Sequence, residues 1–152
     1  MGVARRSPGG EQMKISLPAR LYKIGALMVL VTGGRKFNDE LLLFDALDQV
    51  ETMVDAAGLQ MTVLQGGANG ADRLARQWAW HNEREYITEP ARWVEHGKSA
   101  GPRRNQLMID KHHPDLCIAM PGGAGTNDMV QRCQAAGIPV YQGGQDDEQP
   151  GR

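Results

Sequence analysis

The chain has 152 residues and a mass of 16.7 kDa, which is enough for one folded domain and too short for two ordinary ones. Its 17 basic and 18 acidic side chains leave a net charge of −1, so charge alone offers no general attraction to nucleic acid or to anionic membranes. The longest nearly apolar run, residues 24–31, is far shorter than the ~20 residues of a membrane helix, and no membrane partner is expected. Cys117 and Cys133 lie in apolar patterns and are predicted to be buried thiols of a cytoplasmic protein.

Along the chain, short runs of β-forming residues alternate with helical patterns. Residues 1–23 are rich in Gly, Pro, Arg and Lys and are predicted to form a flexible arm, and residues 142–152 a disordered tail. Residues 24–141 are predicted to form the domain between them. Its five buried strands are expected at residues 27–32, 61–65, 85–88, 116–120 and 138–141.

Four helices are predicted between these strands, because apolar side chains recur there every three or four residues. Asn38 or Asp39 can cap the first helix, and Gly58 is expected to end it. The second helix is expected to follow Gly70. The third is expected to begin near Pro102 and to continue to about residue 111. The fourth is expected to start at a Thr126 cap and to end at Gly137.

This alternation predicts an α/β fold, with a doubly wound, Rossmann-like parallel sheet of about five strands in a single domain. With the usual strand order 3-2-1-4-5, the chain reverses direction between the first and the fourth strand, and ligands bind beyond the carboxyl ends of the strands at that point. The loops after these two strands are therefore expected to face one cleft.

Glycines gather in the loops that follow the first, second and fourth predicted strands. Glycine lets backbone N–H groups approach a ligand closely, and each loop leads into a helix N-terminus, whose dipole favours anions. A phosphate group is the expected ligand. The alternative is that these turns need glycine for backbone geometry alone. Neither a G-x-x-x-x-G-K-[ST] motif nor a G-x-G-x-x-G after the first strand is present, which argues against P-loop NTPases and dehydrogenases. The glycines predicted to bind ligand are Gly33, Gly34, Gly66, Gly67, Gly70, Gly122, Gly123 and Gly125.

Basic side chains gather at the start of the third predicted helix, where Lys98, Arg103, Arg104 and Asn105 are predicted to contact the ligand. Arginine suits bidentate binding of phosphate or carboxylate, although each arginine could instead be a solvated surface residue.

Four further residues are candidates in or near the loops. Arg35 follows the first glycine pair and could reach the cleft, and Thr126 lies beside the last glycines. Asn69 can either take left-handed turn geometry or bind a ribose. Trp93 could stack on a base, but a core or dimer contact is the favoured interpretation.

Together, four segments in this order resemble one family: LMVLVTGGRKFND, TVLQGGANGADRLARQWA, HGKSAGPRRNQLM and LCIAMPGGAGTNDMV. The resemblance is to the YspA/YpsA-like branch of the SLOG superfamily, whose members include the LOG phosphoribohydrolases and the DNA-processing protein A. It covers about residues 27–141. It implies a Rossmann-like fold that binds nucleotides or nucleotide-derived ligands, and, because related proteins are commonly dimers, a homodimer.

LOG enzymes cleave the N-glycosidic bond of nucleoside 5′-monophosphates with an arginine and the glutamate of a PGGxGTxxE motif. Here Met129 occupies the position of that glutamate, and a methionine can neither stabilise an oxocarbenium-like state nor activate water. If the chain is a hydrolase, the resemblance points to Asp128 or Asp72 as the substitute and to Arg104 as the arginine. Such a carboxylate is expected to stay ionised, and its alternative role is to stabilise a helix dipole.

Three functions therefore remain open. The leading hypothesis is a protein that senses or sequesters a nucleotide or nucleotide-derived small molecule, and the alternatives are a LOG-like phosphoribohydrolase and a single-stranded DNA-binding protein. No cofactor is expected. A metal site at His112, His113 and Cys117 is disfavoured, because the histidines end a helix while the cysteine lies inside a strand.

Overall fold

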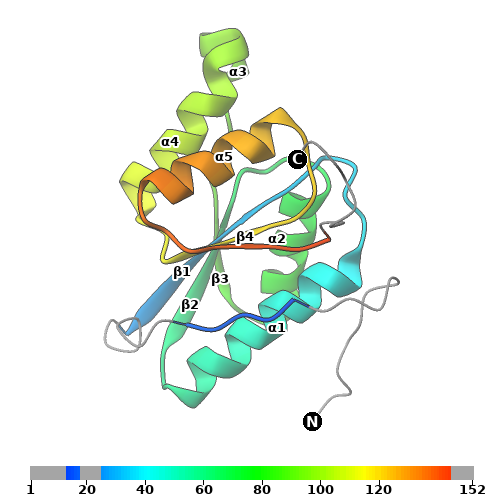
Figure 1. Cartoon of the computed structure of the whole chain (residues 1–152), viewed down its shortest axis with the longest axis vertical. Helices are drawn as coiled ribbons and strands as arrows, with labels where there is room; N and C mark the ends of the chain where they lie inside the picture. The colour runs from blue at the N-terminus through cyan, green and yellow to red at the C-terminus, as the bar shows by residue number, and fades with distance from the viewer. Residues whose placement is uncertain (1–12, 18–24, 145–152) are drawn as a thin grey trace.

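The computed structural model describes residues 13–17 and 25–144, and Figure 1 shows five parallel strands flanked by helices. The strands lie in the order β3-β2-β1-β4-β5, which confirms the predicted doubly wound topology. No helix in these two ranges is long and apolar enough to cross a membrane. The strands are β1 (Ala26–Thr32), β2 (Gln60–Gln65), β3 (Glu85–Thr88), β4 (Leu116–Ala119) and β5 (Val140–Gln142). The helices are α1 (Glu40–Ala56), α2 (Ala71–His81), α3 (Trp93–His96), α4 (Ala100–His112) and α5 (Ala124–Ala135).

Apolar side chains alternate between the two faces of β1 and create one core on each side of the sheet. Val29 and Val31 pack with α1 and α2, whereas Leu30 packs with α4 and α5. Both cores are needed because a central parallel strand is buried on both faces. Cys117 and Cys133 lie in the second core, and both are buried thiols, as predicted.

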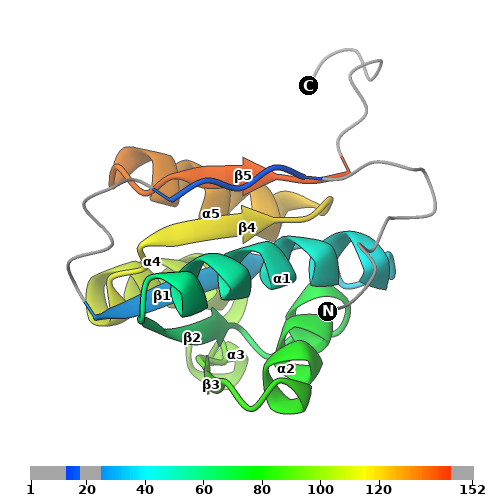
Figure 2. The same ribbon diagram turned by 90° about the horizontal axis from the view of Figure 1, so that it is seen from below.

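Residues 13–17 belong to the packed domain, although the sequence assigned them to the flexible arm. Met13, Ile15 and Leu17 are buried in the core beside α1, and the Ile15 N–H donates to Gln49 Oε1 at 3.0 Å. Figure 2 shows this dark blue segment running alongside β5, where the Tyr141 hydroxyl donates to the Ser16 carbonyl. Residues 142–144, predicted as the start of the disordered tail, are ordered, since Gln142 ends the last strand and the Gly143 N–H donates to the Ala119 carbonyl at 2.9 Å. The rest of the predicted arm, residues 1–12 and 18–23, and residues 145–152 of the tail lie outside the described residues.

Two predicted details of secondary structure were wrong, and one segment has structure that was not predicted. The strands β3 and β5 are not fully buried, because both lie at edges of the sheet, where only one neighbouring strand covers them. The last helix begins after Gly123, so Thr126 lies inside its first turn rather than at its cap. The third predicted helix starts at Ala100 and is preceded by α3 and a short 3₁₀ turn (Gly97–Ser99), which the sequence pattern did not predict.

Candidate functional site

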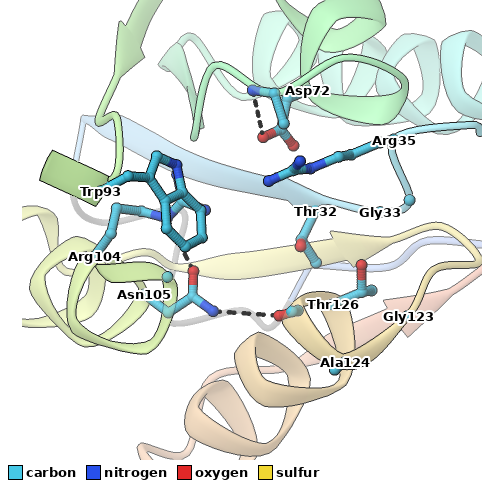
Figure 3. Close-up of a pocket in the computed structure, with 14 residues that line it drawn as sticks. Thr32, Gly33, Arg35, Asp72, Trp93, Arg104, Asn105, Gly123, Ala124 and Thr126 are labelled. Carbon is cyan, nitrogen blue, oxygen red and sulfur yellow. Dashed lines mark hydrogen bonds between the residues drawn. The ribbon is translucent and has the colours of Figure 1, made fainter. Parts of the chain in front are cut away.

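A cavity of about 360 Å³ opens at the carboxyl ends of β1 and β4, on the side of the sheet where the sequence predicted a cleft. The loop after β1, the start of α2, the region from α3 to α4 and the N-terminus of α5 enclose it (Figure 3). The predicted ligand-binding residues that line it are Gly33, Gly34, Arg35, Asp72, Arg104, Asn105, Gly123, Gly125 and Thr126.

The N-terminus of α5 is open toward this cavity. Gly123 is the residue before the helix, and no side chain caps the first turn. The first N–H groups of an α-helix have no partner within the helix, so those of Ala124, Gly125 and Thr126 are available to an anion. A Cβ atom added at Gly123 or Gly125 would meet no atom within 4 Å, which means that open space adjoins the backbone there.

Arg35 brings a positive charge to the same space. Its side chain extends toward the centre of the cavity in Figure 3, and within the described ranges it makes no hydrogen bond or ion pair. Its guanidinium lies 5.9 Å from the centre of the Trp93 ring, at cation–π distance. The five N–H donors of Arg35 are therefore available to a ligand.

Arg104 differs from Arg35 because backbone and side-chain atoms hold it in place. Its Nη1 donates to the carbonyl oxygens of Gly66 at 3.0 Å and Glu89 at 3.2 Å, and its Nε donates to Asn105 Oδ1 at 3.0 Å. Asn105 in turn donates from Nδ2 to the Gly125 carbonyl at 3.2 Å. Burial lowers the pKa of Arg104, but its ordinary pKa is so high that it remains a fixed cation at the wall.

Asp72 is the carboxylate in the cavity wall. Only 7% of the residue is exposed, and its Oδ2 accepts the N–H groups of Gly66 and Ala68, both at 3.2 Å. Burial raises the pKa of Asp72 to about 6, against the lowering effect of these N–H groups and of Arg104 and Arg35. Desolvation therefore outweighs the nearby positive charges, and Asp72, which was expected to stay ionised, titrates about one pH unit below neutrality.

Asp128, the other predicted carboxylate, does not line the cavity. Its Oδ2 accepts from Asn105 Nδ2 at 2.9 Å and from Arg132 Nε at 2.7 Å. Its partial burial favours a higher pKa, but the hydrogen bonds from Arg132 and Asn105 outweigh that effect and lower the pKa of Asp128. Asp128 therefore ties α4 to α5 rather than facing a ligand.

A second cavity, of about 320 Å³, adjoins the first, and Arg35, Trp93 and Arg104 border both. Small residues of the loop after β2 and of the segment after β3 form its other walls. Three more of the predicted binding residues line this second cavity, namely Gly66, Gly67 and Asn69.

Four predicted ligand-binding residues line neither of these two cavities. Arg103 donates to Ser99 Oγ at 3.0 Å and borders a third hollow, on the other side of Arg104, and Lys98 lies on the exposed 3₁₀ turn. Gly70 and Gly122 instead allow close packing, since a Cβ at Gly70 would lie 2.7 Å from the Arg35 carbonyl and one at Gly122 would lie 2.7 Å from the Gly34 nitrogen.

Trp93, for which a core or dimer contact was favoured, is not a core residue, and the dimer contact stays a prediction. In the structure 49% of Trp93 is exposed, and its ring stands at the boundary of the two cavities. A single aromatic residue in a polar segment shows no helical or strand periodicity. The sequence therefore did not indicate whether Trp93 is buried or exposed. Thr32 and Ala124, which also line the first cavity, gave no signal beyond their position next to the glycine loops.

His112 and Cys117, the disfavoured metal candidates, each contact another partner. His112 Nε2 lies 3.0 Å from Glu89 Oε1, and this hydrogen bond is the main reason why the pKa of Glu89 is lowered. Cys117 contacts the Cys133 thiol, and this contact together with burial raises the pKa of Cys117.

Comparison with known proteins agrees with the fold. Residues 27–96 match the model of the YspA, cpYpsA-related SLOG family, and this range includes the first two glycine loops, Asp72 and Trp93. The gene 61 protein of Mycobacterium phage D29 is 40% identical over 119 residues, which cover 74% of this chain and 92% of the phage protein. The chain therefore belongs to the YspA, cpYpsA-related SLOG family.

Proposed function

We propose that the protein binds a nucleotide or a nucleotide-derived small molecule, with a phosphate group at the N-terminus of α5. The observation that carries the proposal is the uncapped first turn of α5, which opens into the same cavity as the guanidinium of Arg35, a group with no hydrogen bond or ion pair to residues 13–17 or 25–144. Backbone N–H groups at a helix N-terminus and a free arginine are both strong partners for phosphate oxygens.

The size and polarity of the site support this proposal. The cavity of about 360 Å³ falls within the ~300–1,000 Å³ range that is typical of small-molecule sites. Positive charge from Arg35 and Arg104 exceeds the single negative charge of Asp72 among the residues that line it. An anionic ligand of modest size therefore fits better than a neutral one.

The first test is to incubate the purified protein with a pool of nucleoside monophosphates, cyclic nucleotides and NAD-derived nucleotides. Mass spectrometry of the retained and the free fractions then identifies bound and released species. Retention of an intact nucleotide supports the proposal. Failure to retain any member of the pool at millimolar concentration overturns it.

The variant Arg35→Ala is expected to bind the retained nucleotide roughly tenfold or more weakly, because a charge-assisted hydrogen bond contributes about 1.5–3 kcal/mol. Calorimetric titration measures the loss. The matched control is Lys36→Ala, which removes the same charge from the next residue, one that does not line the cavity. Equal losses in both variants would mean that only net charge matters, and would contradict a specific role for Arg35.

A LOG-like hydrolase is the second candidate, because Asp72 places a carboxylate with a raised pKa in the wall of the cavity. In such a reaction Asp72 takes a proton from water, and the hydroxyl group adds to C1′ of the sugar as the bond from C1′ to the base breaks. The departing base keeps the electron pair of that bond and takes a proton from solvent, and Asp72 returns its proton to solvent. The products are the free base and ribose 5-phosphate.

If the protein is a hydrolase, release of base from a nucleoside monophosphate is expected to fall at least a hundredfold in Asp72→Asn, as general-base catalysis typically contributes that much. Asp128→Asn is the control and is expected to retain activity, since Asp128 faces Arg132. Liquid chromatography of the free base measures both. An intact ligand with no base released would exclude this second candidate.

A further inference from the structure

Trp93 has the position of a binding residue rather than that of a structural one. It is 49% exposed and borders both cavities, and no described apolar side chain encloses it in either core. The approach of Arg35 to within 5.9 Å of the ring centre restrains the indole on one side. The ring also lies near Gly101 of α4, where an added Cβ would be 3.4 Å from it, an ordinary van der Waals contact. A half-exposed indole is thus held at the boundary of the two cavities.

The second cavity has a different chemical character from the first. Its walls are formed by the glycines and Ala68 of the loop after β2, by Asn69, and by Pro90 and Ala91. Unlike the first cavity, it has no carboxylate among its lining residues, and its charged groups are the two arginines that it shares with the first. Small apolar walls beside an indole suit a flat, aromatic, uncharged group, and Asn69 offers both a donor and an acceptor to its edge.

The two cavities together match a ligand with two unlike ends. The anion-binding end would lie at the N-terminus of α5, and the second cavity adjoins the first where Arg35 and Trp93 border both. We propose that the second cavity binds the aromatic base of a mononucleotide and that Trp93 stacks on this base. This inference rests on the proposed function and narrows it, because it assigns the ligand to nucleoside phosphates rather than to bare sugar phosphates.

Calorimetric titration of two probes, AMP and ribose 5-phosphate, tests the inference, since they share the sugar phosphate and differ in the base. The wild-type protein is expected to bind AMP at least tenfold more tightly, because stacking of a base on an aromatic side chain typically contributes that much. Trp93→Ala is expected to lose roughly tenfold in affinity for AMP and to leave the affinity for ribose 5-phosphate unchanged, whereas Trp93→Phe keeps most of the preference for AMP. CMP in place of AMP checks that the preference extends to a pyrimidine.

The control is Trp80→Ala, which removes a tryptophan that is 68% exposed on α2 and lines neither cavity. It is expected to leave the binding of both probes unchanged. Equal affinities of the wild-type protein for AMP and ribose 5-phosphate, or a Trp93→Ala variant that retains the preference for AMP, would overturn the base-binding role while leaving the phosphate site intact. Failure of both probes and of CMP to bind at millimolar concentration would instead overturn the proposed function, and this inference with it.

Discussion

Replacement of Gly70 by alanine is expected to reduce the free energy of unfolding by about 3 kcal/mol or more. Gly70 has φ +79° and ψ −126°, a conformation that is unfavourable for every residue with a Cβ atom. In addition, the new Cβ would lie 2.7 Å from the Arg35 carbonyl carbon and even closer to the Gly34 carbonyl oxygen, so the first two glycine loops would have to separate. Strain of this kind and overpacking each cost about 1–3 kcal/mol. Urea denaturation of the variant measures the sum.

Gly58→Ala is the matched control for this experiment. Gly58 follows α1 with φ +71°, but a Cβ there would meet no atom within 4 Å. The control therefore carries the backbone strain without the clash and is expected to lose only about 1 kcal/mol. Similar losses in the two variants would contradict the conclusion that Gly70 is required for the close approach of the loops. The Ala71 N–H donates to the Gly34 carbonyl at 3.2 Å, and this hydrogen bond is the contact that the clash disrupts.

Asp72→Asn is expected to change how the stability of the protein depends on pH. Burial raises the pKa of Asp72 from 3.8 to about 6, so between these two values the folded protein binds a proton that the unfolded chain has released. Stability from this group is therefore fully present below pH 3.8 and is lost as the pH rises through 6. With about 1.4 kcal/mol per pKa unit, the loss amounts to roughly 2–3 kcal/mol between pH 4 and pH 7. An asparagine side chain does not titrate, so the stability of the variant does not fall with pH for this reason.

The measurement is the free energy of unfolding of the wild-type protein and of Asp72→Asn at pH 4, 5, 6 and 7. The asparagine variant is expected to gain stability relative to the wild-type protein as the pH rises. Asp128→Asn serves as the control with the opposite sign, because the pKa of Asp128 is lowered and its ionised form stabilises the fold at neutral pH. Parallel pH profiles for the wild-type protein and Asp72→Asn would show that Asp72 is not desolvated.

The pH window matters for the site as well as for stability. Asp72 lies in the wall of the cavity that is proposed to bind phosphate, and it is mostly protonated, and so mostly uncharged, once the pH falls well below 6. Arg35 and Arg104 then face the anion without a competing carboxylate. For a hydrolase, in contrast, the ionised form above pH 6 is the one that accepts a proton.

The strand order and the location of the glycine loops could be predicted from the sequence because they depend on local patterns. Apolar runs such as residues 27–32 and the 3.6-residue period of α1 are readable in single segments, and alternating strands and helices allow few topologies. This order places the carboxyl ends of β1 and β4 together, so the sequence alone predicts that Arg35 and Gly123 lie at one cleft.

The tertiary structure decided the role of each residue within that cleft. In the sequence, Asp72 and Asp128 lie equally close to glycine loops. In the structure, Gly66 and Ala68 pack against Asp72 and desolvate its carboxylate. The carboxylate of Asp128 is instead neutralised by Arg132. Gly70 could equally have served a ligand or a close contact between loops, because a glycine in a sequence does not reveal what approaches it.

Residues 13–17 and Trp93 are the clearest cases in which burial could not be predicted from the sequence. Residues 13–17 alternate apolar and polar side chains, but a run of five residues is too short to establish a strand by itself. The segment is buried where Gln49 of α1 and Tyr141 of β5 lie beside it. By itself, the sequence determined the order of the elements and the edge of the sheet at which the site lies. The burial of Asp72 and of residues 13–17 and the exposure of Trp93 depend on contacts between segments far apart in the chain, and those contacts exist only in the folded protein.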